Sequence, residues 1–196
     1  ASEAGYPQVR MVCMMELSRH LIVDSAFDSV TESEMNLAAR MIERMPNDSL
    51  TLFDKGSYSL GLLHDWQQRG TNTHWLPPLK KRTQYEVIQS FGKQDKLILL
   101  YTTPQSRKKR PALPESIEAR LLTRKIKGKA VQILTSMTDP MAYPSTDIVD
   151  LYAHRWEIEI GYREIKHRCL KVGLRYEVTC QSYYSGVVGA YCLDII

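Results

Sequence analysis

The chain of 196 residues has few cysteines and no long apolar run. Its four cysteines form no CxxC pair and no metal-ligand pattern, so a disulfide framework and a structural zinc are not expected, and buried thiols in a reducing cytoplasm fit better. No apolar run reaches the roughly 18 residues that a transmembrane helix needs. With 43% hydrophobic and 24% charged residues, the sequence predicts a soluble globular protein with a real core.

Acidic residues are scarce in one region of the chain. Between residues 80 and 129, 14 Lys and Arg stand against 4 Asp and Glu, whereas the rest of the chain is net acidic. A solvated basic surface is one interpretation. A footprint for a nucleic-acid backbone is favoured, because the basic clusters alternate with strand-like segments and do not form a tail. The predicted DNA contacts in two of the densest clusters are Lys80, Lys81, Arg82, Arg107, Lys108, Lys109 and Arg110. The third dense cluster of this footprint is Arg124 and Lys125 with Lys127 and Lys129.

The N-terminal part has the pattern of a hairpin followed by a helix. Two segments rich in apolar and β-branched residues, 9–17 and 20–27, flank a tight turn, which predicts two paired strands. Thr31 and Glu34 fit a capping box, and an apolar helical face follows until Pro46 ends it.

Asp54 follows the third predicted strand, an apolar run at residues 49–53, and precedes a second helix that ends at Gly70. An aspartate here can be a turn former or a helix cap. It can also be a ligand group, because open α/β sheets place such groups at the carboxyl ends of their strands.

Residues 73–137 change to short alternating runs that predict an antiparallel β region carrying the basic clusters. Within it, residues 104–114 are interpreted as a mobile basic loop. Near the end of the chain, an apolar segment from Ser182 is expected to be helix-like and to pack on the sheet.

Residues 145–170 predict a long helix with functional side chains on one face. Tyr152, Arg155, Glu159 and Lys166 fall within roughly 60° of one another at about 100° per residue. The conservative interpretation is a solvated helix in which Arg155 and Glu159 form an i, i+4 ion pair. The alternative is a metal-ligating glutamate whose cationic and phenolic neighbours hold phosphates.

The spacing of these four residues resembles the Y-R-E-K signature of the DDE transposases of the insertion-sequence-four family. The segment LTLFDKGSYSLGLL resembles the surroundings of the second catalytic aspartate of that family, which corresponds to Asp54. The resemblance implies that Asp54 and Glu159 are catalytic and bind Mg²⁺ or Mn²⁺, and that Tyr152, Arg155 and Lys166 contact DNA. In that family the first catalytic aspartate would lie on a strand before the hairpin, and no residue of this sequence is assigned to that role.

The resemblance further implies an α/β, ribonuclease-H-like domain that lacks its first strand and contains an all-β insertion. Residues 1–72 and 141–196 would form the catalytic core, with the basic insertion at 73–140. The implied function is DNA transposition: cutting at insertion-sequence ends and joining to target DNA, in the bacterial cytoplasm at the nucleoid, by a protein that is dimeric when full length. A non-catalytic DNA-binding remnant of a transposase is the alternative, and a nuclease sharing only the fold is a third possibility.

Overall fold

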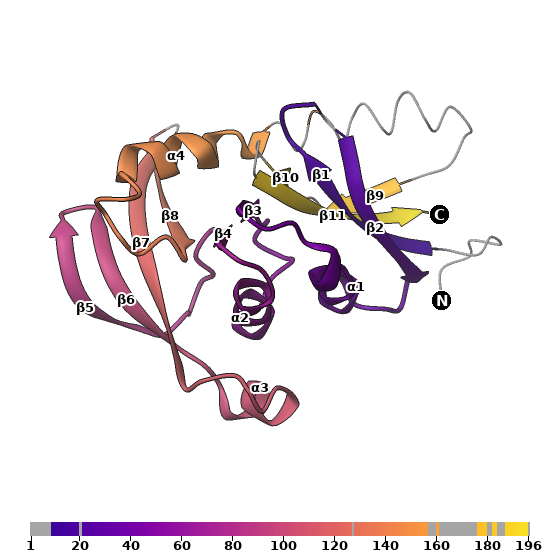
Figure 1. Cartoon of the computed structure of the whole chain (residues 1–196), viewed down its shortest axis with the longest axis horizontal. Helices are drawn as coiled ribbons and strands as arrows, with labels where there is room; N and C mark the ends of the chain where they lie inside the picture. Colours follow the sequence, from indigo (N-terminus) through magenta and orange to yellow (C-terminus); the bar gives the residue numbers. More distant parts are fainter. Residues whose placement is uncertain are drawn as a thin grey trace.

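The computed structural model describes residues 9–19, 21–126, 128–156, 160, 176–179, 182–183 and 187–195. These residues form one sheet of seven strands and one of four, with short helices beside them. The two sheets lie at opposite ends of the long axis in Figure 1. The chain is therefore a mixed α/β protein. Within the described part, no helix is both long and apolar enough to cross a membrane.

The larger sheet, called the core sheet here, begins with the predicted hairpin. Strands β1 (Val9–Glu16) and β2 (Leu21–Ser29) pair antiparallel, which confirms that prediction. On its other side β1 pairs antiparallel with β11 (Val187–Ile195), and β11 pairs in parallel with β3 (Ser49–Leu52). Strand β4 (Thr73–Leu76) extends the sheet in parallel with β3. Strand β11 thus lies between the hairpin and β3.

The prediction of a helix-like segment from Ser182 is wrong. This part of the chain contains β10 (Ser182–Tyr183) and β11, and β9 (Tyr176–Thr179) precedes them. The sequence of β11, VVGAYCLDI, includes a glycine and several β-branched residues. The β-branched residues lose side-chain freedom in a helix and fit a pleated sheet, and the glycine weakens a helix, so the strand is the favoured state once β1 offers an edge.

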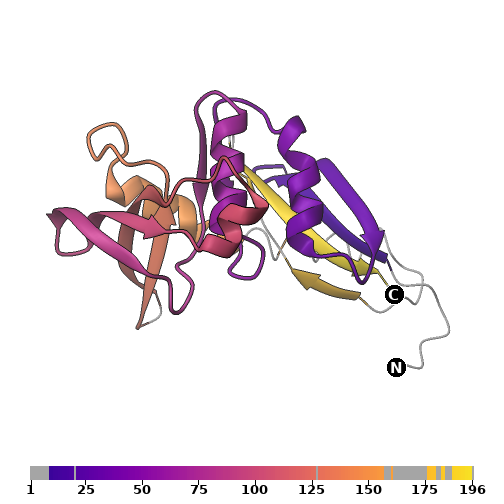
Figure 2. The same cartoon turned by 90° about the horizontal axis from the view of Figure 1, so that it is seen from below.

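Two helices cover one face of the core sheet. Helices α1 (Glu34–Met41) and α2 (Leu60–Arg69) lie in front of its strands in Figure 2, and a 3-10 turn (Ile42–Arg44) follows α1 before Pro46. Both helices were predicted. Their inward faces and the strands share the fully buried large side chains, among them Leu37, Met41, Leu52, Phe53, Leu62, Leu63, Trp66 and Trp75.

Ser33 caps the first helix. Its hydroxyl accepts a hydrogen bond from the backbone N of Asn36 at 3.1 Å. The predicted capping box on Thr31 is wrong, because the Thr31 backbone and hydroxyl contact the Ser29 hydroxyl and close the turn after β2. The helix accordingly starts two residues later than the box implies.

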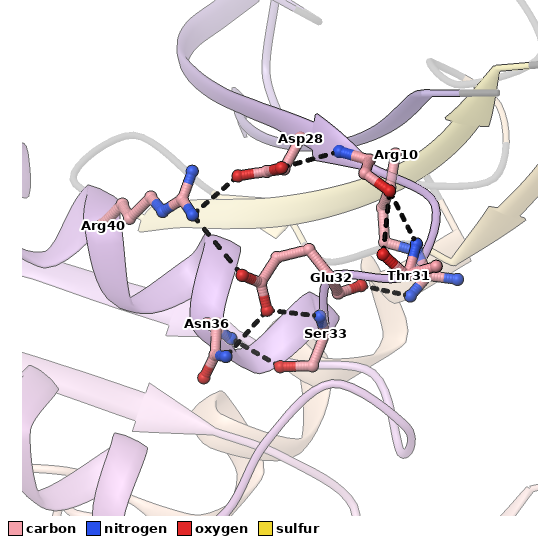
Figure 3. A network of polar contacts seen from close by, with 8 residues as sticks. Arg10, Asp28, Thr31, Glu32, Ser33, Asn36 and Arg40 are labelled. Atoms are coloured by element: carbon pink, nitrogen blue, oxygen red, sulfur yellow. Dashed lines mark hydrogen bonds and ion pairs between the residues drawn. The ribbon is translucent and has the colours of Figure 1, made fainter. Parts of the chain in front are cut away.

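A polar network attaches α1 to the edge of the core sheet (Figure 3). Arg40 of α1 lies 2.7 Å from the Asp28 carboxylate of β2 and 3.6 Å from that of Glu32. Glu32 also accepts a hydrogen bond from the Asn36 amide at 2.8 Å, and its backbone carbonyl accepts one from Arg10 of β1. These contacts are largely exposed, so they fix the geometry of the corner more than they add stability.

The smaller sheet, called the insertion sheet here, is an antiparallel meander of β5 (Tyr85–Gly92), β6 (Asp95–Tyr101), β7 (Ser116–Ile126) and β8 (Lys129–Thr135). It confirms the predicted antiparallel β region from residue 85 onward. Residues 73–76, which were predicted to belong to that region, instead form β4 and pair in parallel with β3 of the core sheet. The segment interpreted as a mobile loop contains α3 (Pro104–Lys109), which follows β6. Extended chain after β4 runs beside β8, with backbone hydrogen bonds of 2.9 Å from Leu79 N to Gln132 O and from Leu134 N to Pro77 O. This pairing joins the two sheets.

Helix α4 (Ser145–Ala153) leads from the insertion sheet toward the core sheet (Figure 1). It starts where the long helix was predicted, with Pro144 before its first turn. Among the described residues it ends at Ala153, with His154 as its C-cap. Most of the predicted remainder, including Glu159 and Lys166, lies outside the described residues.

Candidate functional site

Asp54 is held at the carboxyl end of β3 by buried neighbours. All four residues of β3 are buried, and the backbone N of Phe53 donates to Leu76 O of the neighbouring β4 at 3.3 Å. The Phe53 ring packs edge-on against Trp66 of α2, with 5.1 Å between ring centroids. Beyond this anchor the chain turns, and the Asp54 side chain is 34% exposed. A rigid strand therefore presents a carboxylate that solvent can reach.

The signature residues Tyr152 and Arg155 lie beside this carboxylate. Nη1 of Arg155 is 3.9 Å from Oδ1 of Asp54. Tyr152, at the end of α4, is only 7% exposed. Burial raises the pKa of the Tyr152 phenol; the charge of Asp54 raises it further and that of Arg155 opposes the shift. Tyr152 thus keeps its proton at ordinary pH and can donate a hydrogen bond to a phosphate oxygen.

Lys80 turns inward at this site. Its Nζ donates to the backbone carbonyl of Tyr58 and lies 4.3 Å from the centroid of the Tyr58 ring. The Tyr58 hydroxyl donates to Pro78 O at 2.7 Å, and burial raises the pKa of this phenol. Lys80 and Tyr58 thus fasten the turn after Asp54 to the chain that leaves β4. Burial lowers the Lys80 pKa, as expected for an ammonium that has lost part of its hydration.

A pocket of about 620 Å³ opens between α4 and the insertion sheet. It has three cationic side chains, two aromatic ones and an apolar floor. Trp156, one of its lining residues, is 51% exposed. Cations suit phosphates and an exposed indole can stack on a base, so this combination of side chains suits a nucleotide. The pocket is lined by Arg124, Lys125, Val131, Val149, Tyr152, Ala153, Arg155 and Trp156.

The predicted basic clusters divide into two groups. Lys81, Arg82, Lys108 and Lys109 are exposed, and the side chains of these four have no described intramolecular partner among the residues that the structure covers. The other three point inward or along the surface toward protein groups. They are Lys80, Arg107 and Arg110.

Helix α3 presents the second cluster. Thr103 caps it and Pro104 begins it. Arg107 donates to the Thr102 carbonyl at 2.8 Å, and Arg110 donates to Asp65 of α2 at 2.6 Å. These two bonds fix the helix to the protein.

Glycine 61 makes room for that attachment. A Cβ at Gly61 would lie 2.8 Å from Cδ of Arg110, so the arginine side chain would have to shift if α2 carried a side chain here. Lys108 and Lys109 consequently stand on an anchored helix, and the prediction of a mobile loop is corrected at this point.

A family model described as "Transposase DDE domain" matches residues 1–192. The chain belongs to this DDE transposase family. The transposase InsG of insertion sequence element IS4 from Escherichia coli K12 is 54% identical to it over 163 residues, 83% of this chain and 37% of the relative. A putative transposase InsZ from the same strain is 39% identical over 85 residues, 43% of this chain and 28% of the relative. No solved structure matches.

The chain therefore spans little more than a third of the length of the first of these DDE transposases. Family proteins of this kind generally use divalent metal ions and act on DNA. Among the described residues of this chain, no group of three or more His, Cys, Asp or Glu could hold a metal ion. Asp54 fits a metal as an accessible carboxylate, which is the ligand type that hard cations prefer.

The sequence did not predict how three parts of this candidate site are arranged. Lys80 contacts Tyr58, Arg124 and Lys125 line a pocket with α4, and Trp156 lines the same pocket. Arg124 and Lys125 were expected only as a dense basic cluster, and Trp156 had a local signal because it follows Arg155 directly. The other contacts depend on how the insertion sheet sits beside the core, which no short motif specifies.

Proposed function

We propose that this chain forms part of the catalytic core of a DNA transposase that cuts at insertion-sequence ends and joins them to target DNA. The observation that carries the proposal is the approach of Arg155 to Asp54, 3.9 Å apart. The two motifs resembled the same family separately, and the fold brings them to one place across about a hundred residues. If the helix were only a solvated one with an ion pair between Arg155 and Glu159, the contact between Arg155 and Asp54 would not be expected.

Asp54 and Glu159 are the proposed metal ligands, with Mg²⁺ or Mn²⁺ as the ion. We expect the carboxylates of Glu159 and Asp54 to lie within about 8 Å of each other, since both are hard ligands expected to share one metal site. When bound, such ions activate the attacking oxygen and stabilise the leaving one in phosphodiester transfer. Arg155 and Lys166 would neutralise phosphates, and Tyr152 would donate to one from its buried position.

Lys81, Arg82, Lys108 and Lys109 are proposed to hold the DNA backbone, because their ammonium and guanidinium groups are exposed and turned to solvent. Lys80, Arg107 and Arg110 are proposed to contribute mainly by shaping the surface. This division refines the DNA-binding set expected from sequence. The proposed form of the full-length protein is a dimer.

The identity of strand β11, at the centre of the core sheet, affects whether this chain alone is expected to cut DNA. A ribonuclease-H-like core carries its first catalytic aspartate on the strand beside β3, and we infer that β11 occupies this place. The parallel register ends with Leu52, two residues before Asp54, paired with Gly189 of β11, and the four residues after Gly189 are not acidic. This favours the second candidate function, a DNA-binding part of a transposase whose first aspartate comes from elsewhere.

Metal and DNA titrations test the proposal on this chain. Titration with Mn²⁺, followed by calorimetry, should give weak binding that Asp54→Asn and Glu159→Gln each reduce, whereas Asp139→Asn, an exposed control, leaves it unchanged. Unaltered Mn²⁺ binding in both variants would contradict the assigned ligands. Duplex carrying an insertion-sequence end should bind with an affinity that falls steeply with salt. No nicking by this chain is expected, because two carboxylates cannot complete a two-metal site.

A further inference from the structure

The insertion sheet contains a buried ion pair that the proposed chemistry does not use. Arg120 of β7 is 1% exposed and Asp95 of β6 is 14% exposed. Arg120 Nε donates to Asp95 Oδ1 at 2.7 Å and Nη2 donates to Oδ2 at 2.5 Å, which is a bidentate arrangement. The ring of Phe91 lies 5.7 Å from the guanidinium carbon. Arg120 is the one charged residue among the described ones that is buried.

Burying this pair requires an explanation beyond stability. Two charges taken out of water lose hydration that their attraction only partly restores, and apolar replacements of similar volume are often as stable. A buried ion pair is better explained by a role in holding neighbouring segments in one geometry. The remaining contact of Arg120 identifies which geometry is fixed here.

That contact is to the residue before the turn into α4. Arg120 Nη1 donates to the backbone carbonyl of Tyr143 at 2.6 Å. Pro144 follows, and α4 starts at Ser145 without a side-chain cap. The bidentate bond to Asp95 leaves Nη1 aimed at this carbonyl, so the pair sets where the chain enters α4.

Tyr143 is also tied to the core sheet through its side chain. Its hydroxyl lies 3.2 Å from Nε2 of His74 in β4, and the two rings meet edge to face with centroids 5.2 Å apart. Nδ1 of His74 is 3.1 Å from the Ser136 hydroxyl, which in turn accepts from the backbone N of Trp75 at 3.1 Å. A single residue thus connects the insertion sheet, the core sheet and the start of α4.

The far end of α4 carries the site. Helix α4 has nine residues, which corresponds to about 13 Å at 1.5 Å per residue, and Arg155 follows two residues after its end. Over that length, a tilt of about 10° at the entrance would move the far end by about 2 Å. Such a movement would separate Arg155 from Asp54.

We propose that Arg120, held by Asp95, is a positioning residue that places Tyr152 and Arg155 beside Asp54 by fixing the Tyr143 carbonyl at the entrance of α4. The role of Arg155 toward DNA rests on the proposed function, whereas the effect of Arg120 on the geometry of α4 does not. It gives the insertion a second task beside carrying basic charge: it sets the direction of the signature helix.

Arg120→Lys is the first test, because lysine keeps a charge for Asp95 and cannot also donate to Tyr143 in the fork geometry. The readout is a double-mutant cycle with Arg155→Ala, measuring affinity for duplex DNA at one low salt concentration. Arg120→Lys should weaken binding about fivefold alone and by less than about 1.5-fold when Arg155 is already alanine. Equal effects in both backgrounds would overturn the proposal, since a general loss of structure does not depend on Arg155.

Acrylamide quenching of tryptophan fluorescence gives a second readout that needs no DNA. Trp66 and Trp75 are fully buried, so the accessible signal comes from Trp156, next to Arg155. Arg120→Lys should change its quenching constant, and Arg44→Lys, an exposed pair with Asp24 elsewhere, should not. If neither the parent nor any variant binds DNA, the proposed function fails, but the quenching of Trp156 still tests whether Arg120 positions α4. Unchanged quenching in Arg120→Lys would overturn the positioning role of Arg120.

A third variant covers the case in which Arg120→Lys unfolds. Arg120→Met with Asp95→Leu replaces the pair by apolar chains, which keeps the melting temperature close to that of the parent while removing the donor to Tyr143. The proposal predicts that this double variant is folded and shows the same altered Trp156 quenching. A folded double variant with parental quenching and DNA affinity would contradict it.

Discussion

Arg155 and Asp54 face each other across the junction of α4 and the core sheet, with 3.9 Å between Nη1 and Oδ1. The positive charge of Arg155 therefore lies where it would repel a cation bound to Asp54. If Asp54 holds a metal as proposed, the ion and Arg155 would compete for the same carboxylate, and the guanidinium would be released toward a DNA phosphate.

The first prediction follows from this competition. Arg155→Ala should raise the affinity of the chain for Mn²⁺ by about fivefold, because a positive charge about 4 Å from a partly exposed carboxylate is removed. Electron paramagnetic resonance of free Mn²⁺ measures this directly. Arg44→Ala serves as the control, because Arg44 is exposed and pairs with Asp24 and not with Asp54. Lower or equal Mn²⁺ affinity in Arg155→Ala would mean that the arginine does not oppose the metal.

The second prediction separates DNA contacts from anchors. Lys108→Glu with Lys109→Glu should weaken binding to all duplex sequences alike and reduce the salt dependence, with little change in melting temperature. Asp65→Asn should instead lower the melting temperature by loosening the 2.6 Å bond from Arg110. Anisotropy with labelled DNA and a thermal scan provide the two measurements. The reverse pattern would show that α3 is not the DNA-facing element.

The third prediction concerns pH. Burial lowers the pKa of His74, so the folded chain takes up its proton at lower pH than the unfolded chain. The unfolded state then binds more protons between the lowered pKa and about 6.5, and stability falls as pH decreases through that window. Urea unfolding at several pH values should show a steeper loss below about pH 6.5 in the parent than in His74→Gln. Equal slopes would contradict the lowered pKa.

The fourth prediction tests the packing behind Asp54. The indole N of Trp66 donates to the Thr51 hydroxyl at 2.9 Å inside the core. Thr51→Val keeps the shape but leaves this donor without an acceptor, at a cost of about 1–3 kcal/mol in the free energy of unfolding. Thr51→Ser, which retains the hydroxyl, is the matched control and should keep the indole bond. Denaturant titration of both variants gives the comparison.

The sequence predicted those helices and strands whose ends are marked by nearby residues. The hairpin, α1, β3 and α2 were each marked by patterning, turn residues or a terminal glycine or proline, and all are present. The four strands of the insertion were recognised by alternation. Asp54 was placed at a strand end, and its approach to the Tyr152 and Arg155 stretch is what a resemblance in two motifs would lead one to expect.

Other features depended on contacts between distant segments. Strand β11 forms because β1 and β3 leave room between them, which its own sequence does not reveal. Helix α3 had a usable local signal, Thr103 followed by Pro104, but its basic composition resembled a loop. The inward turn of Lys80 could not be inferred, because a lysine in a basic run looks the same whether it faces solvent or an aromatic ring. Glu159 and Lys166 lie outside the described residues, so their placement stays a prediction.

The pairing of β1 with β11 also sets the order in which the core sheet can form. Val9 pairs with Ile195 and Met15 with Gly189, so the contacts at the middle of the sheet span more than 170 residues. Loop closure over such distances is slow compared with forming the neighbouring hairpin or the insertion meander. During synthesis on a ribosome, the hairpin and the insertion sheet would emerge before β11, and the edge of β1 would stay unpaired until β11 is made. The centre of the molecule would therefore be the last part to fold.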